Sequence, residues 1–235
     1  MMPAAGPPKC KLPDLTHLKS SDYQNVYEPS DDTFLLVDAL AQEAAHADSA
    51  PQRGPPPLLC VEVGSGSGTV VTHLGLLSRD APANSPRRSV ALMATDLNPL
   101  AATATAATAA VNGVRVHAIH MDLLSSFRRG VIDMIIFNPP YVPTSIEECV
   151  DGAAARDISA AWAGGPHGRL VLDRLLPELR SLLAPNGLFY LLGVKENEPE
   201  ELGEMMGKEG FTSETIAQRR AQNERLFVMR FSRGA

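Results

Sequence analysis

The stretch that decides the fold is the apolar run 131–137, Val-Ile-Asp-Met-Ile-Ile-Phe, followed at once by Asn138-Pro139-Pro140-Tyr141. A short apolar run rich in β-branched residues predicts a buried strand. Proline fixes φ and has no N–H, so the two prolines hold the backbone still and leave its carbonyl oxygens free to accept hydrogen bonds. The tetrapeptide suits a planar substrate group that bears N–H bonds, gripped by carbonyl oxygens and stacked on Tyr141. Asn-Pro by itself usually marks only a turn, and the glycine loop upstream favours the functional interpretation.

Outward from this strand, short apolar runs alternate with segments of helical spacing. The other predicted strands span 58–63, 89–95, 114–119, 187–194, 211–217 and 224–231. The predicted helices span 30–40, 69–78, 99–111, 169–183 and 198–208. This alternation predicts an α/β fold with a mostly parallel, doubly wound sheet that is covered on both faces. The last two strands have no helix between them, which predicts one antiparallel strand.

The composition is that of a single folded domain. The chain has 235 residues, is 44% hydrophobic and carries a formal net charge of −6. We expect the domain over residues 22–235, after a proline-rich, disordered tail over residues 1–21. Within the domain, 48–57 is expected to be a linker and 81–88 an insertion. The acidic balance argues against stable nucleic-acid binding through broad neutralisation of phosphates.

The cysteines and the apolar segments indicate in which cellular compartment the protein is expected. Cys10, Cys60 and Cys149 lie far apart, without the spacing of a disulfide framework or a zinc site. No stretch is long enough to cross a bilayer, and the N-terminus lacks the apolar segment of a secretory signal. A cytoplasmic location is therefore expected, with access to the nucleus left open.

A glycine loop, Glu62-Val63-Gly64-Ser65-Gly66-Ser67-Gly68, follows the strand predicted over 58–63. The dinucleotide fingerprint fails here, because Thr69 stands where its third glycine should be. The P-loop pattern fails as well, since the lysine it needs is missing. The remaining glycines let the backbone pass close to a ligand. Glu62 would repel a phosphate and attract a cation.

Two further carboxylates follow predicted strands. Asp96 ends the strand 89–95, where a carboxylate can accept the two hydroxyls of a ribose, although it could also be the N-cap of a helix that begins at Pro99. Asp122 follows the strand 114–119 and could accept from the exocyclic amine of an adenine, with Leu123 packed on the ring. A lone Asp after a strand is more often a cap. Three acidic groups without a phosphate cradle indicate a cationic nucleoside, for which S-adenosylmethionine is the natural candidate.

These motifs, in this order and spacing, resemble a class I methyltransferase of the N-methylating Asn-Pro-Pro-Tyr group. The segments 26–36 (Val-Tyr-Glu-Pro-Ser-Asp-Asp-Thr-Phe-Leu-Leu), 161–165 (Ala-Trp-Ala-Gly-Gly) and 194–197 (Val-Lys-Glu-Asn) narrow the match. They resemble the HemK family, in its short eukaryotic and archaeal branch. The resemblance covers residues 22–233. It implies a Rossmann-like sheet of seven strands in the order 3-2-1-4-5-7-6.

The resemblance also implies roles for residues of this chain. The methionine part of the methyl donor is expected at Thr33, Glu62 and Gly64, its ribose at Asp96, and its adenine at Asp122 and Leu123. Asn138 is shared between donor and substrate. The substrate is bound by Asn138, Pro139, Pro140 and Tyr141, of which Asn138, Pro139 and Tyr141 are the expected catalytic residues. Family members methylate the glutamine side-chain amide in the Gly-Gly-Gln motif of class I translation release factors, and no metal is required.

A partner is implied for the predicted edge strand 114–119. An uncovered edge invites strand addition, and proteins of this branch work with a small zinc-binding activator subunit that pairs there. Other acceptors stay open at this point, namely histone lysine, or adenine in DNA. The acidic balance and the lack of a target-recognition domain argue against DNA. A non-catalytic adapter that keeps the fold is a third hypothesis, against which the intact acidic residues argue.

Three histidines and one tryptophan could each have either a structural or a functional role. His73, His117 and His120 have no cysteine or second histidine at metal-ligand spacing, so we interpret them as structural. Trp162 could border the substrate groove or serve as a packing anchor. The sequence leaves this alternative open.

Overall fold

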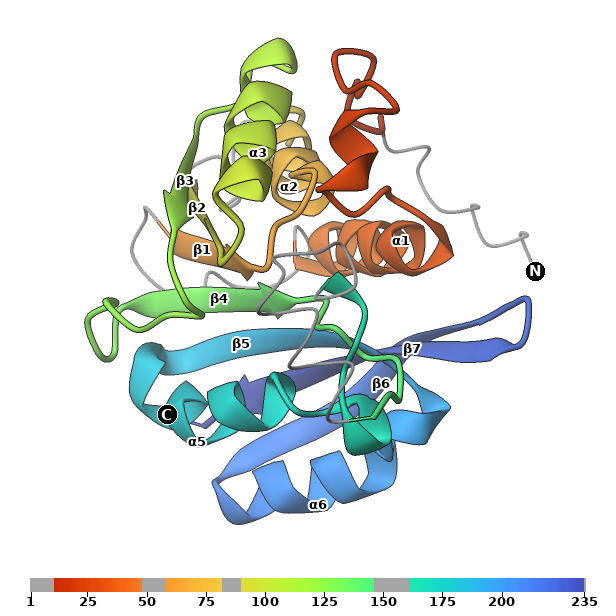
Figure 1. Cartoon of the computed structure of the whole chain (residues 1–235). Helices are drawn as coiled ribbons and strands as arrows, with labels where there is room; N and C mark the ends of the chain where they lie inside the picture. The colour runs from red at the N-terminus through yellow and green to blue at the C-terminus, as the bar shows by residue number, and fades with distance from the viewer. Residues whose placement is uncertain (1–10, 48–57, 82–89, 146–160, 235) are drawn as a thin grey trace, which may run out of the picture.

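The computed structural model describes residues 11–47, 58–81, 90–145 and 161–234 (Figure 1). Its strands are β1 (Leu58–Val63), β2 (Val90–Asp96), β3 (Val116–His120), β4 (Ile132–Phe137), β5 (Leu183–Val194), β6 (Phe211–Ala221) and β7 (Glu224–Arg233). Its α-helices are α1 (Asp31–Ala47), α2 (Thr69–Arg79), α3 (Pro99–Val111), α5 (Leu172–Leu182) and α6 (Pro199–Lys208). The described residues also form short 3-10 helices, η1 (Asp22–Gln24), η4 (Pro166–Gly168) and η5 (Lys195–Asn197). The expected linker 48–57, and all of the expected insertion 81–88 except Ala81, lie outside the described residues.

The strands form one seven-stranded sheet in the order β3-β2-β1-β4-β5-β7-β6. β1 pairs in parallel with both β2 and β4, whereas β7 runs antiparallel to β5 and β6. The predicted fold and strand order are therefore confirmed. Helices α1, α2 and α3 cover one face of the sheet, and α5 and α6 cover the other (Figure 1). The chain leaves the centre of the sheet in one direction after β1 and in the other after β4, so the topological switch point lies between these two strands.

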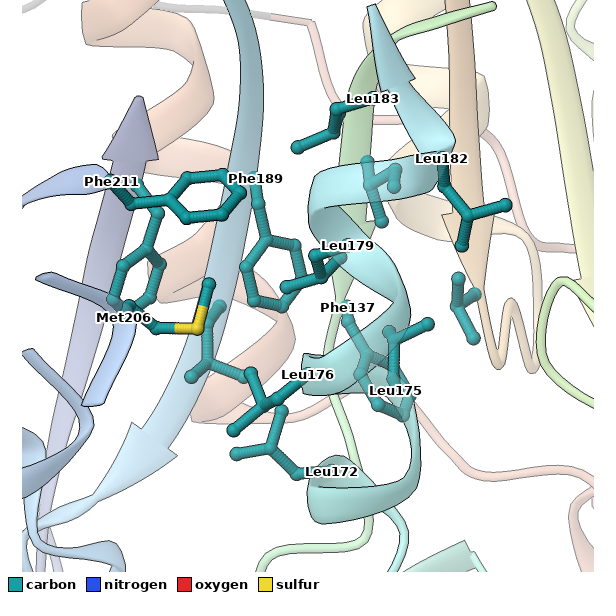
Figure 2. Packing of buried hydrophobic residues seen from close by; sticks show 14 of the residues in the cluster. Phe137, Leu172, Leu175, Leu176, Leu179, Leu182, Leu183, Phe189, Met206 and Phe211 are labelled. Atoms are coloured by element: carbon teal, nitrogen blue, oxygen red, sulfur yellow. The ribbon is translucent and has the colours of Figure 1, made fainter. Parts of the chain in front are cut away.

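The largest cluster of core residues lies between the sheet and helices α5 and α6 (Figure 2). Leucines at helical spacing make α5 apolar on one side, and Leu175 and Leu179 are fully buried there. Phe137, the last residue of β4, packs into the same cluster. Burying a side chain of this size is worth about 1.5–3 kcal/mol. The strand that carries the Asn-Pro-Pro-Tyr motif is thus anchored immediately before the motif begins.

The N-terminal boundary needs correction. The structure describes residues 11–21, which we expected to belong to a disordered tail, and gives them specific contacts with α3. The Asp14 N–H donates to Asn112 Oδ1 at 2.7 Å, and Asn112 Nδ2 donates back to the Asp14 carbonyl at 2.9 Å. His17 Nε2 lies 3.2 Å from Thr108 Oγ1. The folded part therefore begins before Asp22, while residues 1–10 lie outside the described residues.

Element ends differ from the predicted ones by a few residues. The strand expected to begin at 187 begins at Leu183, because the backbone becomes extended directly at the end of α5. The strand expected over 114–119 spans Val116–His120. In the part of the chain that the structure describes, no helix combines the length and the apolar character needed to span a membrane.

Candidate active site

The carboxyl ends of β1, β2 and β4 open onto one cavity of about 880 Å³. Every residue to which the sequence assigned a role lines it: Thr33, Glu62, Gly64, Asp96, Asp122, Leu123, Asn138, Pro139, Pro140 and Tyr141. Parallel strands that meet at a switch point bring their carboxyl ends to one edge of the sheet. Residues that lie up to about a hundred positions apart in the chain are therefore neighbours.

The glycine loop between β1 and α2 depends on left-handed backbone. Gly64, Gly66 and Gly68 have φ of +64°, +54° and +76°, a region that glycine enters without steric cost. A Cβ at Gly68 would stand 2.7 Å from the Cα atom of Thr105 on α3. Thr105 Oγ1 donates to the Gly66 carbonyl at 3.1 Å. Helix α3 thus packs directly against the loop and holds it at the rim of the cavity.

Glu62 is a buried carboxyl group at the end of β1, 3% exposed. Its Oε2 accepts from the Val71 N–H at 2.8 Å. Burial raises the pKa of Glu62 to about 8; the hydrogen bond from Val71 opposes this rise, and the nearby Asp96 adds to it. The side chain is therefore protonated at neutral pH until a cation in the cavity stabilises the carboxylate.

Asp96 is held by two backbone donors at the end of β2. Its Oδ2 accepts from the Gly66 N–H at 2.9 Å and its Oδ1 from the Asn98 N–H at 2.8 Å. Burial raises the pKa of Asp96, and these two hydrogen bonds work against the rise. The N-cap of α3 is Asn98, whose Oδ1 accepts from the Leu100 N–H at 2.9 Å. The alternative interpretation of Asp96 as that cap is therefore excluded, and the carboxylate faces the cavity.

Asp122 has a partner that the sequence did not reveal. Arg174 on α5 places Nη2 2.5 Å from Asp122 Oδ2, and both side chains line the cavity. The next residue, Leu123, has φ of +49°. The left-handed region costs a non-glycine residue about 1–2 kcal/mol, so the surrounding structure imposes it. The result is an apolar side chain and a charge pair side by side at one end of the cavity.

In the side-chain amide of Asn138, the nitrogen is hydrogen-bonded and, within the described part of the chain, the oxygen is not. Its Nδ2 donates to Asp32 Oδ2 at 2.9 Å. Its Oδ1 is buried and has no hydrogen-bond partner among the described residues. Leaving a buried acceptor unsatisfied costs about 1–3 kcal/mol, so this atom is poised for an N–H donor that enters the cavity. Asp32 is 2% exposed, and its Oδ1 also accepts from the Thr33 N–H at 2.6 Å.

Asp32 is a site residue that sequence reasoning missed. It lies in the first turn of α1, where any acidic residue is favourable for the helix dipole, so its position alone does not indicate a role in the site. The only signal was its place directly before Thr33. The contact with Asn138 joins residues 106 positions apart, and no local pattern encodes such a distance.

Aromatic side chains form the wall beside Asn138. Tyr141 is 8% exposed, and its pKa is raised by burial and by the nearby Asp32 and Tyr27, so the phenol stays neutral. Trp162 is 39% exposed and also lines the cavity, which places it at the border of the site. His73 is fully buried in α2, as expected for a structural residue, and burial lowers the pKa of its imidazole.

Metal binding finds no support in the described ranges, which hold no group of three or more His, Cys, Asp or Glu side chains that could hold an ion. His120 lines the cavity beside Asp96. Cys60 is a buried free cysteine in β1 and a small residue of the core.

The order of the strands and the carboxyl groups at the switch point of the sheet are those of a class I methyltransferase. Enzymes of this class use S-adenosylmethionine. The family model "Methyltransferase small domain" matches residues 60–161. The chain is 43% identical to the mouse "Methyltransferase HEMK2" over 229 residues, which cover 96% of this chain and 98% of that relative. The chain belongs to the HEMK2 family of methyltransferases.

One further relative agrees with this assignment, and one solved structure shares the fold. The Schizosaccharomyces pombe "eRF1 methyltransferase catalytic subunit mtq2" is 33% identical, over 94% of this chain and 95% of that protein. The solved E. cuniculi Mtq2–Trm112 complex, responsible for methylation of the eRF1 translation termination factor, has the same fold. Its matching chain has a TM-score of 0.63 and 23% identity, and the match covers 89% of this chain and 99% of that one.

Proposed function

We propose that this chain transfers a methyl group from S-adenosylmethionine to the side-chain amide nitrogen of glutamine in the Gly-Gly-Gln motif of a class I translation release factor. The observation that carries the proposal is the buried, unpaired Oδ1 of Asn138, in a cavity that the next residue, Pro139, also lines. A primary amide has two N–H groups, which this oxygen and the Pro139 carbonyl would accept. The relatives named as eRF1 and glutamine methyltransferases support the same substrate class.

The cavity fits the methyl donor. S-adenosylmethionine supplies an electrophilic methyl group on a positively charged sulfur. We assign its methionine part to Thr33, Glu62 and Gly64, its ribose to Asp96, and its adenine to Asp122 and Leu123. Glu62 would pair with the ammonium group, and both Asp96 oxygens keep a lone pair for the ribose hydroxyls. The absence of a phosphate-binding fingerprint agrees with a nucleoside that carries no phosphate.

The acceptor amide is a weak nucleophile, because its lone pair is delocalised into the carbonyl. Asn138 Oδ1 and the Pro139 carbonyl accept its two N–H bonds and aim the nitrogen at the methyl group. Positioning of this kind can supply about 7–11 kcal/mol of the barrier reduction. The nitrogen lone pair forms the new N–C bond while the C–S bond breaks and its electron pair stays on sulfur. Carbonyl dipoles stabilise the charge that develops on nitrogen, and its proton leaves afterwards to water.

We also propose that a small zinc-binding activator subunit adds a strand to β3. β3 lies at the edge of the sheet, paired with β2 (Figure 1). Helix α3 packs against β3 and carries two exposed apolar side chains, Leu100 at 53% and Val111 at 52%. Apolar surface beside an open strand edge is typical of a protein interface. The chain expressed with its activator should be soluble and active, and a soluble, monodisperse and fully active isolated chain would contradict this.

Methyl transfer from labelled donor tests the substrate. The acceptors are a release factor, the same factor with Gln→Ala at Gly-Gly-Gln, and histone, followed by mass-spectrometric mapping of the modified atom. We expect label on the glutamine of the intact factor and none on the Gln→Ala variant. Label on a histone lysine, with the release factor unmodified, would replace the glutamine assignment by the lysine alternative.

A further inference from the structure

The loop 138–141 presents the acceptor-binding groups, yet it has few means of holding itself in place. Pro139 and Pro140 have no N–H, so two backbone donors that could anchor the loop are missing. The loop must therefore be held through its carbonyl oxygens or by packing. The neighbouring segments 161–168 and 194–197, which no role in the reaction explains, supply both kinds of contact.

The first contact is a side-chain amide from η5. Asn197 is 2% exposed, and its Oδ1 accepts from the Val194 N–H at 2.7 Å. This bond orients Nδ2 towards the loop, where it donates to the Tyr141 carbonyl at 2.9 Å. The same Nδ2 donates to the carbonyl of His167 at 2.9 Å and approaches that of Gly168 at 3.4 Å. One amide group thus joins the acceptor loop to η4.

The second contact is close backbone packing. A Cβ at Gly164 would stand 2.5 Å from the Pro140 carbonyl oxygen. A Cβ at Gly168 would stand 1.9 Å from the Tyr141 carbonyl oxygen and 2.5 Å from Asn197 Nδ2. Real Cβ atoms do not approach so closely, so only glycine fits at these positions. The carbonyl oxygens of Pro140 and Tyr141 therefore rest directly on the segment that Asn197 bridges.

A third set of bonds continues the attachment beyond the loop. Val142 forms a parallel bridge with Ala163. The Val142 N–H donates to the Trp162 carbonyl at 3.0 Å, and the Gly164 N–H donates to the Val142 carbonyl at 2.8 Å. These bonds begin at the first residue after the tetrapeptide. The loop is thus tied down at its end, while Phe137 anchors its start in the core.

An ion-pair network holds the element that carries Asn197. Arg169, 5% exposed, follows Gly168 in the chain. Its guanidinium lies 3.1 Å from Asp173, 3.2 Å from Glu201 and 3.7 Å from Glu198. Glu198 and Glu201 belong to the start of α6, directly after η5. The network therefore couples η4 to the η5–α6 junction and leaves Asn197 little freedom to move.

We infer that Asn197 is a positioning residue of the methyl-transfer reaction. By binding the Tyr141 carbonyl it fixes the acceptor loop on the glycine segment, so that Asn138 Oδ1 and the Pro139 carbonyl stand in register with the transferred methyl group. Asn197 itself does not line the cavity that holds donor and acceptor. The inference rests on the proposed function, because it takes the loop to be the acceptor clamp.

The decisive variant is Asn197→Asp, made in the chain expressed with its activator. The aspartate keeps an oxygen that can accept from the Val194 N–H. It replaces the NH2 group of Asn197, which donates to the carbonyls of Tyr141 and His167, by a second oxygen that cannot donate to them. Calorimetry measures the affinity for S-adenosylhomocysteine and the concentration of sites that bind this product, and the maximal rate divided by that concentration gives kcat per site. The expected result is unchanged affinity with a fall in kcat per site of about 100-fold, as for a misplacement of about 1 Å. Counting only binding-competent sites removes any loss due to unfolded protein.

Two further variants keep the test sharp. Gly164→Ala adds a methyl group against the Pro140 carbonyl without removing a hydrogen bond, and should lower kcat per site while affinity is kept. Met206→Ala empties a buried site in α6 away from the loop, and should lower the melting temperature with kcat per site unchanged. If Asn197→Asp does not fold, Gly164→Ala decides in its place.

Wild-type kcat per site in Asn197→Asp, or a parallel fall of kcat per site and affinity, would overturn the positioning role. The wild-type enzyme on the release factor is the first arm of the assay. If that arm shows no transfer, the proposed substrate is wrong. The variants are then compared on the acceptor that the site mapping identifies, which still decides the role of Asn197.

Discussion

Asn138 Nδ2 donates to Asp32 Oδ2 at 2.9 Å, and this one hydrogen bond decides which end of the Asn138 amide is left without a partner among the residues that the structure describes. A carboxylate oxygen accepts, so the amide must turn its NH2 group towards Asp32. The carbonyl end, Oδ1, is then the free acceptor in the cavity. The start of α1 and the end of β4 cooperate in this arrangement.

Asn138→Ala should abolish methyl transfer and leave most of the donor affinity. The change removes one of the two oxygens that hold the acceptor amide, and loss of one such polar group costs about 100- to 1,000-fold in kcat. Labelled methyl transfer and calorimetric titration with S-adenosylmethionine check the two halves. If turnover survives the change, Asn138 is not the acceptor clamp.

Asp32→Asn should lower kcat about 10-fold or more, because an amide in place of the carboxylate no longer forces Asn138 to present its oxygen. The matched control is Asp31→Asn, which removes the same charge from the adjacent, exposed residue. Steady-state kinetics on both variants, each with its donor affinity, make the comparison. Equal activity of the two variants would show that the orientation of the Asn138 amide is set by something other than Asp32.

Donor affinity should rise with pH because Glu62 must lose a proton to pair with an ammonium group. Burial raises the pKa of Glu62 to about 8, so the free protein holds the proton below that pH. Between pH 6 and 7 the α-amino group of the donor stays protonated, and affinity should increase about 10-fold. Calorimetry in buffers of different ionisation enthalpy should also show about one proton released per site.

Glu62→Gln provides the control for this pH dependence. The variant cannot release a proton, so its affinity should be lower than that of the wild type and flat over the same range. A wild-type affinity that is independent of pH, or a slope that persists in Glu62→Gln, would assign the proton to another group.

Leu179→Ala should lower the free energy of unfolding by about 2–5 kcal/mol, because it leaves a cavity beneath α5 in the core of Figure 2. Leu170→Ala, at a side chain that is 47% exposed, should change it by less than about 0.5 kcal/mol. Denaturant unfolding measures both. Similar losses in the two variants would show that the α5 leucines contribute little to the core.

Local chemistry in the chain was enough to predict the class of fold and most of the cavity. The apolar run before Asn138 and the paired prolines mark a strand end, and Glu62 and Asp96 mark two more. Because the carboxyl ends of parallel strands lie at one edge of a sheet, locating these ends also located the cavity. Strand periodicity is a short-range property, and a sequence displays it directly.

Three features were decided by the tertiary structure. Asp32 meets Asn138, Arg174 meets Asp122, and Asn197 meets Tyr141 across separations of 106, 52 and 56 residues. The contacts of residues 11–21 with α3 were also decided by the tertiary structure, because that segment has no hydrophobic periodicity from which they could be predicted. Hydrogen-bond partners so far apart are chosen by how helices and loops pack on the sheet, and packing depends on the whole chain at once. The sequence by itself determined which groups reach the cavity, and the folded structure determined which way each of them points.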